Sequence, residues 1–316
     1  MSIYLITGAT GYIGSMLVKH IKETDEGAGI TALVRDRTKA RNMLPHNVQI
    51  IEADLTDREK VASLNLDCDH MIHCASVTAS KEMISHPVEV TESIVNTAQN
   101  ILELARQSPV KSMVYLSSME VYGKLDRPGK DRITEEEALR GEVELLASRS
   151  CYPLGKRMAE NICFSYFKEY GVPIKIARLA QTFGEGVLPS DKRVFAQFAR
   201  AVREGRDIVL HTQGRSMGNY CGIHDAVSGI MAILEKGTDG EAYNVVNEAN
   251  TMTIRQMAEL VADKIAGGSI KVVYDITEDD RYGYARDTAL CLSGKKLMAL
   301  GWKPKESLED MYGQLI

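Results

Sequence analysis

A glycine-rich turn stands between the first apolar run of the chain and its first amphipathic stretch. Residues 7–14 are T-G-A-T-G-Y-I-G, with the spacing G-x-x-G-x-x-G, between a predicted strand at 3–7 and a predicted helix at 12–22. Glycine allows a tight strand-to-helix turn and lets the backbone approach a pyrophosphate closely. The helix N-terminus offers that anion unpaired N–H groups and a positive dipole end. The turn therefore predicts a dinucleotide site that includes Gly8, Thr10, Gly11, Tyr12, Ile13 and Gly14.

Short apolar runs alternate with helical stretches through the first half of the chain. Further strands are predicted at 30–34, 48–52, 70–74, 112–117 and 174–178, and helices at 57–64, 88–106 and 152–170. This alternation predicts a parallel sheet with helices on both faces, which is a doubly wound α/β fold of the Rossmann type. The second half is less regular, with helices expected at 194–203, 225–235 and 253–266 and short strands at 208–211, 242–246 and 270–274.

The change in pattern suggests two domains. We expect a dinucleotide-binding and catalytic domain at 1–175 and a smaller, mainly substrate-binding α/β domain at 176–316. Segments near 220–246 are expected to return to the first domain.

Composition excludes several classes of protein. The chain has 316 residues, 44% hydrophobic and 26% charged, with a net charge of −5. That balance is typical of a globular protein and does not favour nucleic-acid binding, which depends on neutralising phosphates. No apolar run approaches the ~20 residues of a membrane span, and the N-terminus lacks the basic region of a signal peptide. We therefore expect a cytoplasmic protein with neither membrane nor nucleic acid as partner, and its 6 cysteines, without C-x-x-C spacing, are expected to be reduced.

The residues after the second predicted strand bear on the choice of cofactor. Many dinucleotide folds place an acid there to bind the adenosine 2′-hydroxyl. Here Val34 is followed by Arg35, and a guanidinium suits a 2′-phosphate better. Asp36 keeps NAD open, and a solvated basic helix start is a third interpretation, so we predict NADP or NAD with NADP slightly favoured. After the third strand, Asp54 and Leu55 are placed to contact adenine, and capping of the next helix is the alternative for Asp54.

Three further residues form a candidate catalytic group. Tyr152 and Lys156 are spaced i, i+4, so they share one face of the helix predicted at 152–170. A lysine ammonium beside a phenol favours the phenolate and lowers the tyrosine pKa, which gives a base near neutral pH. Ser118 follows the fifth strand, where its hydroxyl can bind the oxygen whose proton is moved.

Together these motifs resemble the extended short-chain dehydrogenases/reductases that act on nucleotide sugars, and most of all the bacterial epimerase/dehydratase branch used in surface-polysaccharide synthesis. The resemblance covers about residues 3–303 and rests on segments 7–14, 54–55, 73–76, 118–123, 152–156, 178–184, 219–225 and 300–302. It implies that Tyr152 takes the proton of a sugar hydroxyl, usually at C4, while a hydride goes to the nicotinamide. Ser118 would bind the resulting keto oxygen, and Lys156 would bind the nicotinamide ribose.

The resemblance also implies further contacts. Ala75, Ser76 and Leu179 would lie along the cofactor. Gln181 stands where relatives often have an asparagine near the nucleotide diphosphate. The predicted substrate contacts are Ser118, Met119, Gln181, Arg215 and Tyr220. Relatives usually form homodimers, here through the helices at 88–106 and 152–170.

Two departures from the family pattern limit the assignment. Met119 precedes Glu120 where dehydratases commonly carry an acid, and methionine cannot protonate a leaving hydroxyl. Glu120 could still remove a carbon-bound proton, and its alternative is a local bond to backbone or to a basic neighbour. Gly218 replaces an arginine expected near the diphosphate, for which Arg215 or Arg193 is the candidate substitute.

The preferred hypothesis is a nucleotide-sugar 4-epimerase that works through a transient 4-keto sugar. The alternatives are an NADPH-dependent 4-keto-sugar reductase, a decarboxylase or dehydratase that uses Glu120, an enzyme of small non-nucleotide carbonyl compounds, and a dinucleotide-binding sensor or scaffold. No metal site is expected, because the histidines lack ligand spacing and His73 is predicted to be packed. The turn at 184–186 is expected to be mobile near the substrate mouth.

Overall fold

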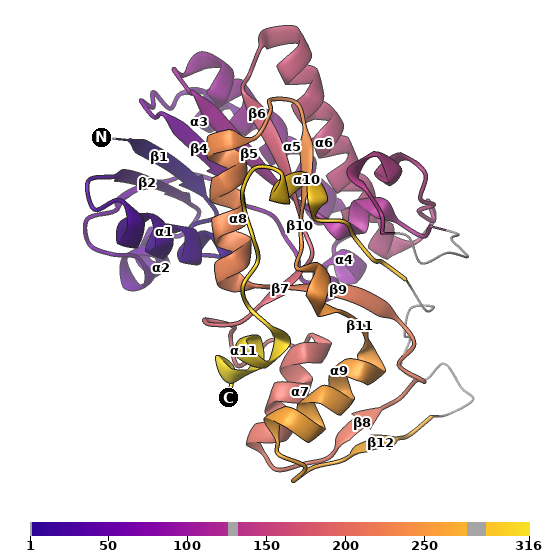
Figure 1. Cartoon of the computed structure of the whole chain (residues 1–316). Coiled ribbons are helices and arrows are strands. Elements are labelled where there is room, and N and C mark those ends of the chain that lie inside the picture. Colours follow the sequence, from indigo (N-terminus) through magenta and orange to yellow (C-terminus); the bar gives the residue numbers. More distant parts are fainter. Residues whose placement is uncertain (1, 126–131, 277–288) are drawn as a thin grey trace.

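A parallel sheet forms the centre of the chain. The structure is a computed structural model that describes residues 2–125, 132–276 and 289–316, and in these residues the sheet has 7 strands in the order β10-β6-β5-β4-β1-β2-β3 (Figure 1). The strands are β1 (Ile3–Thr7), β2 (Gly29–Val34), β3 (Gln49–Glu52), β4 (His70–His73), β5 (Ser112–Ser118), β6 (Ile174–Leu179) and β10 (Ala242–Val245). The order reverses between β1 and β4, as in a doubly wound fold, so the predicted fold class is confirmed.

Helices cover both faces of this sheet. One face carries α1 (Tyr12–Thr24), α2 (Arg37–Met43), α8 (Ile223–Lys236) and α10 (Lys295–Met298), and the other carries α3 (Arg58–Ala62), α4 (Ser80–Ser85), α5 (Pro87–Gln107) and α6 (Cys151–Tyr170). In β1, buried Leu5 and Ile6 join the cores on opposite faces. Burial on both faces explains why the strands are continuous apolar runs in the sequence.

A smaller part of the molecule lies beyond one end of the sheet (Figure 1). It contains α7 (Val194–Arg203), α9 (Ile254–Leu260), α11 (Leu308–Gly313) and the short strands β7 (Gln181–Phe183), β8 (Ile208–Leu210), β9 (Met217–Gly222), β11 (Thr251–Thr253) and β12 (Val272–Tyr274). Phe183 stacks on Phe195 at a ring-centroid distance of 4.3 Å in the core of this part. Thr253 caps α9, and the stretch expected as one helix to 266 changes to a π-helical turn at Val261–Ile265.

The chain returns to the central sheet after building part of this smaller unit. β10 pairs with β6, and α8 packs on the sheet. Trp302, near the C-terminus, also packs in this core, where its Nε1 donates to the Ser228 hydroxyl at 3.1 Å. The boundary expected at residue 175 falls inside β6, so the sheet extends past it.

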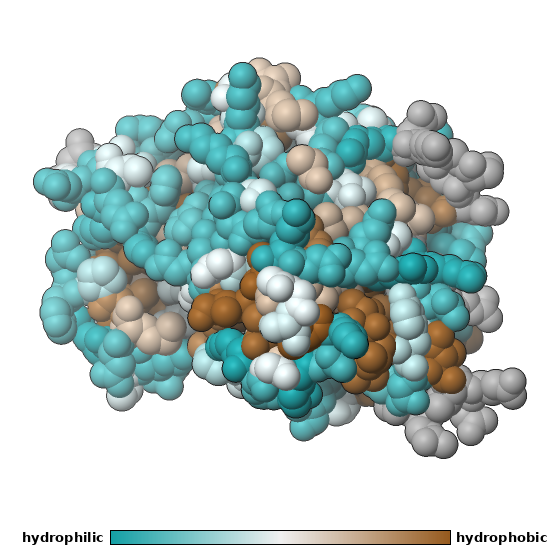
Figure 2. Space-filling model, turned by 60° about the horizontal axis from the view of Figure 1, so that its bottom comes forward, coloured by the Kyte–Doolittle hydropathy of each residue, from teal (hydrophilic) through white to brown (hydrophobic). Residues whose placement is uncertain are grey.

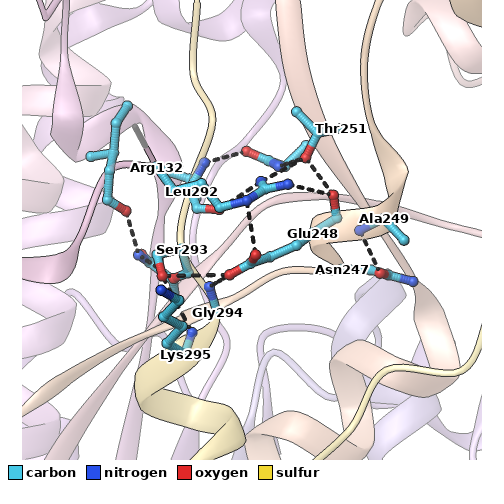
Figure 3. Close-up of polar contacts among 12 residues, drawn as sticks. Arg132, Asn247, Glu248, Ala249, Thr251, Leu292, Ser293, Gly294 and Lys295 are labelled. Carbon is cyan, nitrogen blue, oxygen red and sulfur yellow. Dashed lines mark hydrogen bonds and ion pairs between the residues drawn. The ribbon is translucent and has the colours of Figure 1, made fainter. Parts of the chain in front are cut away.

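Arg132 ties three distant segments together where the two parts meet (Figure 3). Its Nε lies 2.8 Å from Glu248 Oε2, and its Nη2 donates to the Glu248 carbonyl at 2.9 Å. Its Nη1 donates to Thr251 Oγ1 at 3.0 Å and to the Leu292 carbonyl at 3.3 Å. The other Glu248 carboxylate oxygen accepts from the Gly294 N–H at 2.8 Å. One guanidinium thus holds the segments after β10 and before α10 in place.

The outer surface is polar over most of the end that holds the smaller part. Figure 2 shows hydrophilic side chains across this face, with apolar side chains divided among several patches. Within the described ranges, no helix has the length and apolar character required to span a bilayer.

Candidate active site

The turn between β1 and α1 can be built only with glycine at two of its positions. Gly8 has φ of 65°, and a Cβ there would lie 2.7 Å from the Ala75 nitrogen. A Cβ on Gly14 would lie 2.3 Å from the Gly8 oxygen. The segment after β4 therefore packs directly against the turn, and the Ala75 N–H donates to Thr7 Oγ1 at 3.3 Å. The structure brings both predicted cofactor segments together at this point.

The groups around this turn fit a dinucleotide. Gly11 is the N-cap of α1 and offers no side-chain acceptor to the first N–H groups of the helix. Among the described residues, the buried hydroxyl oxygens of Ser76 and Tyr12 have no hydrogen-bond partner. Buried polar atoms are nearly always bonded, so these two are suited to a polar ligand. Thr10, Ile13 and Gly14 complete the turn and the first helical residues.

In the cofactor segment that follows β2, the carboxylate of Asp36 already accepts a hydrogen bond within the protein. Arg35 directly follows β2 and is exposed. Asp36 is the N-cap of α2, and its carboxylate accepts from the Lys39 N–H at 2.8 Å. The short helix α2 therefore begins one residue after Asp36, which leaves the guanidinium of Arg35 as the charged group at the end of β2.

Asp54 and Leu55, the residues predicted to contact adenine, follow β3, and Asp54 does not cap the next helix. Asp54 accepts from the Thr56 N–H at 2.9 Å and its hydroxyl at 2.8 Å, and these bonds lower the pKa of Asp54. The helix cap is Asp57, which accepts from the Lys60 N–H at 3.0 Å, so the capping alternative for Asp54 was wrong. The Leu55 side chain is buried in the core, which leaves only its backbone for a contact with adenine.

Tyr152 and Lys156 lie on one face of α6, as the helical spacing requires, and both are buried. The Lys156 ammonium lies 5.9 Å from the ring centroid of Tyr152 and 4.8 Å from that of Tyr115. It donates to the Leu116 carbonyl at 2.8 Å. Burial lowers the pKa of Lys156 to about 8.

The expected lowering of the Tyr152 pKa is not what this environment produces. Burial, followed by the negative charge of Glu120, raises the pKa of Tyr152 to about 12. A hydrogen bond with Ser118 and the charge of Arg149 act in the opposite direction but are smaller. The prediction was wrong for the protein alone, because removal of the phenol from water outweighs the nearby charges.

Ser118 ends β5 at the carboxyl edge of the sheet, opposite Leu179 of β6. Its hydroxyl accepts from the Glu120 N–H at 3.2 Å and so caps the short 3-10 turn at Met119–Tyr122. Met119 packs against the core, and Gln181 begins β7 just beyond Leu179. Parallel strands place their carboxyl ends on one edge, which explains why these residues converge.

Glu120 forms an ion pair with an arginine that sequence analysis missed. Arg149 Nη1 lies 2.7 Å from Glu120 Oε2, and Nη2 lies 3.0 Å from Oε1. The alternative of a local bond to a basic neighbour is therefore confirmed for Glu120. No motif marks Arg149, and only its position three residues before Tyr152 could have pointed to it.

A buried polar network lies behind these residues. Arg178 Nη2 bonds Glu160 Oε2 at 2.7 Å, and Ser117 Oγ donates to Glu160 Oε1 at 2.5 Å. Arg178 Nη1 donates to the Tyr122 hydroxyl at 3.2 Å, which donates to Asn244 Oδ1 at 2.6 Å. The network links β5, β6, β10 and α6.

His73 is a packed core histidine. Its Nδ1 lies 2.6 Å from Thr7 Oγ1, and its Nε2 lies 3.3 Å from Thr97 Oγ1. Burial and then the charge of Lys156 lower the pKa of His73 to about 3, so the ring is neutral. In the described part of the chain, no three His, Cys, Asp or Glu side chains gather as metal ligands.

Two predicted substrate contacts, Tyr220 and Arg215, have different surroundings. Tyr220 is 1% exposed and packs edge-on against Phe183, because the alternation of β9 turns it into the smaller core. Its prediction as a substrate contact is corrected to a packing role. Arg215 is exposed in the loop before β9, while Arg193 pairs with Asp191 at 2.6 Å.

The turn at 184–186 is anchored, contrary to the expectation of mobility. Glu185 Oε1 lies 2.6 Å from Lys19 Nζ of α1, and Oε2 lies 3.2 Å from His224 Nε2 of α8. The Glu185 N–H donates to Gln314 Oε1 at 2.8 Å. These contacts hold the turn against the helix that opens the glycine-rich site.

Comparison with known proteins relates this arrangement to one family. The model of the NAD dependent epimerase/dehydratase family matches residues 4–246. UDP-glucuronic acid decarboxylase 5 of Arabidopsis thaliana is 28% identical over 312 residues, covering 97% of this chain and 86% of the relative. The low-salt glycan biosynthesis protein Agl12 of Haloferax volcanii is 26% identical over 314 residues, covering 97% and 94%.

Solved structures show the same fold. UDP-glucose 4-epimerase of Thermotoga maritima, with UDP-glucose, has a TM-score of 0.84 at 23% identity, covering 99% of this chain and 97% of that one. UDP-glucose 4-epimerase of Thermus thermophilus, in complex with NAD, has a TM-score of 0.80 at 25% identity, again covering 99% and 97%.

The neutral His73 leads to a prediction on acid stability. Its pKa is about 3 in the fold against 6.5 as the ordinary value, so the unfolded chain binds the extra proton between these pH values. Stability should therefore fall with decreasing pH below 6.5, by up to about 1.4 kcal/mol per pH unit from this group. We expect the stability gap between wild type and His73→Gln to shrink from pH 7 to pH 5, measured by urea unfolding.

Thr97→Val is the matched control, because it removes a partner of His73 and keeps the titrating ring. Its unfolding free energy should follow the wild-type pH dependence. Parallel pH curves for wild type and His73→Gln would contradict the prediction.

Proposed function

The chain belongs to the NAD dependent epimerase/dehydratase family, and from this premise we propose that it decarboxylates a nucleotide hexuronic acid. The membership confirms the resemblance seen in the motifs, and the chain is an NAD-dependent enzyme that modifies nucleotide sugars. The sequence favoured a 4-epimerase. The curated relatives support the decarboxylase alternative instead, since UDP-glucuronic acid decarboxylases match at 25% to 28% identity over nearly the whole chain.

One observation carries the proposal: Ser118 at the end of β5 and the buried phenol of Tyr152 lie close enough that Ser118 lowers the Tyr152 pKa, and the charge of Glu120 acts on the same phenol. A sugar oxygen placed between the two hydroxyls would meet a base and a donor together. Decarboxylation needs such a pair, because negative charge develops on the C4 oxygen as carbon dioxide leaves.

Tyr152, Ser118 and Glu120 each have a separate role in the proposed decarboxylation. NAD held by the glycine-rich turn and by Lys156 would supply an acceptor for the C4 hydride and the same hydride for the final reduction. Burial holds the pKa of Tyr152 at about 12 in the protein alone, so the positive charge of an oxidised nicotinamide would be needed to lower it. Tyr152 would then take the proton of the C4 hydroxyl and return it to that oxygen at the end, and Ser118 would donate a hydrogen bond to the same oxygen. In the resulting β-keto acid, the electrons of the bond between C5 and the carboxylate move to that oxygen, and carbon dioxide is released. C5 then gains a proton from water, and in this proposal Glu120 orients that water.

A 4-epimerase is the second candidate. It needs Tyr152, Ser118 and Lys156 but nothing from Glu120, and the pairing of Glu120 with Arg149 favours this reading. The two functions differ in their products, because only the decarboxylase releases carbon dioxide.

Tyr152→Phe tests the shared chemistry. We expect kcat with UDP-glucuronic acid to fall by about 100-fold or more, with KM within a few-fold, since the base is lost and substrate contacts remain. Carbon dioxide release and the sugar product, followed by NMR, are the measurements. Tyr170→Phe, on the exposed end of α6, is the matched control and should leave kcat unchanged. Release of a 4-epimer from UDP-glucose, without carbon dioxide from the acid, would identify the 4-epimerase instead.

The cofactor proposal concerns the adenosine end of the site. The family is NAD-dependent, and we propose that this chain accepts NADP at least as well, because Arg35 is exposed at the end of β2 and Asp36 is committed to capping α2. Arg35→Ser should weaken NADPH binding about tenfold and leave NADH within twofold, measured by fluorescence titration. Arg41→Ser is the control on α2. Equal effects of Arg35→Ser on both cofactors, or wild-type binding of NADH alone, would refute the preference.

A homodimer through α5 and α6 is the proposed assembly. The two helices pack side by side, and α6 exposes Met158 and Phe164, which are 53% and 45% accessible. Burial of such side chains is the usual source of dimer stability. Sedimentation should give a dimer for the wild type and a monomer for Met158→Glu, whereas Leu188→Glu, outside both helices, should remain dimeric. A monomeric wild type would refute the assembly.

A further inference from the structure

We propose that Arg149 binds a carboxylate on the sugar of the substrate and thereby selects a hexuronic acid over a neutral hexose. The inference rests on the proposed function, because it takes Ser118 and Tyr152 as the place where the sugar binds. Arg149 lies between the motif segments 118–123 and 152–156 and belongs to neither.

Arg149 is close to the proposed reaction centre. It lies in the 3-10 turn at Ser148–Ser150, directly before α6, and its guanidinium reaches Glu120 in the turn that follows Ser118. The charges of both partners act on the Tyr152 phenol. The Arg149 side chain is 46% exposed and that of Glu120 is 26% exposed, so the pair faces open space rather than the core.

The geometry of the pair leaves one edge of the guanidinium free. Glu120 occupies the end formed by Nη1 and Nη2, at 2.7 and 3.0 Å. The side edge, formed by Nε–H and the second N–H of Nη2, has no acceptor among the residues that the structure describes. A guanidinium can bind carboxylates at two edges, and each fork matches the two oxygens of one carboxylate. The free edge is therefore a preformed site for a second carboxylate.

An acidic sugar can bind near Tyr152 only if a cation offsets the negative charge of Glu120. Without Arg149, the negative charge of Glu120 would repel a sugar carboxylate bound beside Tyr152. The neighbouring cations on α6 are occupied: Lys156 donates to the Leu116 carbonyl at 2.8 Å, and Arg157 donates to the Val121 and Gly141 carbonyls at 2.7 Å each. Arg149 both neutralises Glu120 and presents unused donors.

The proposed contact should affect binding more than turnover. The bound carboxylate loses its charge as carbon dioxide forms, so its bond to Arg149 does not strengthen towards the transition state. An interaction of this kind lowers KM without raising kcat. A neutral hexose carries a hydroxyl at C6 instead of a carboxylate. Its single oxygen cannot accept from both N–H groups of the free guanidinium edge as the two oxygens of a carboxylate can.

The experiment compares UDP-glucuronic acid with UDP-glucose, which differ only at C6. Calorimetric titration uses the full-length, cofactor-loaded protein with Tyr152→Phe, so that turnover does not disturb the binding isotherm. Arg149→Met should weaken UDP-glucuronic acid at least about tenfold and change UDP-glucose less than about twofold. Arg149→Lys keeps the charge without the fork and should give an intermediate loss. Arg206→Met, at an exposed arginine paired with Glu204 in the smaller part, is the matched control and should change neither affinity.

A double variant separates direct contact from an effect through Glu120, which Arg149→Met leaves unpaired. If Glu120→Gln/Arg149→Met still binds UDP-glucuronic acid weakly, Arg149 contacts the carboxylate itself. Recovery of the parent affinity in the double variant, or equal losses for both sugars in Arg149→Met, overturns the inference and leaves the proposed function intact. Failure of the parent protein to bind either sugar refutes both.

Discussion

The buried ion pair between Glu160 and Arg178 holds the catalytic side of the molecule together. Glu160 is one helical turn beyond Lys156 on α6, and Arg178 directly precedes Leu179 at the end of β6. Ser117, which donates to Glu160, is the neighbour of Ser118. Removing one partner of a buried pair costs about 3–5 kcal/mol, because the other charge is left without compensation. The relative positions of the proposed base, its lysine and the strand end therefore depend on one interaction that touches no substrate.

The sheet and the cofactor turn could be predicted because their causes are local. Strands buried on both faces are continuous apolar runs, and the turn after β1 needs the positive φ of 65° at Gly8, which glycine adopts without strain. The pairing of Tyr152 with Lys156 follows from helical spacing alone. These features follow from residues that are close together in the sequence, so they can be predicted without knowledge of distant contacts.

The remaining features depend on contacts between distant segments. The high pKa of Tyr152 results from burial, which motifs do not report. Arg149 reaches Glu120 only because η3, the turn at Ser148–Ser150, comes close to the turn that follows β5, and Tyr220 is buried because β9 joins the smaller core. Short elements were missed for a related reason: α2 and α4 are too brief to show a helical period, although Asp36 is an ordinary cap for α2.

The pairing of β10 with β6 also bears on how the protein is made. During synthesis, the first six strands of the sheet leave the ribosome well before residues 242–245, and β7, α7, β8 and β9 of the smaller part are translated in between. Until β10 arrives, β6 is an open edge, and Tyr122 lacks the Asn244 oxygen that receives its hydroxyl proton. The nascent chain therefore carries an exposed strand edge while residues 180–241 are made, and such edges invite pairing with other chains. Completion of the catalytic half is thus a late event, governed by a strand near the C-terminal quarter of the chain.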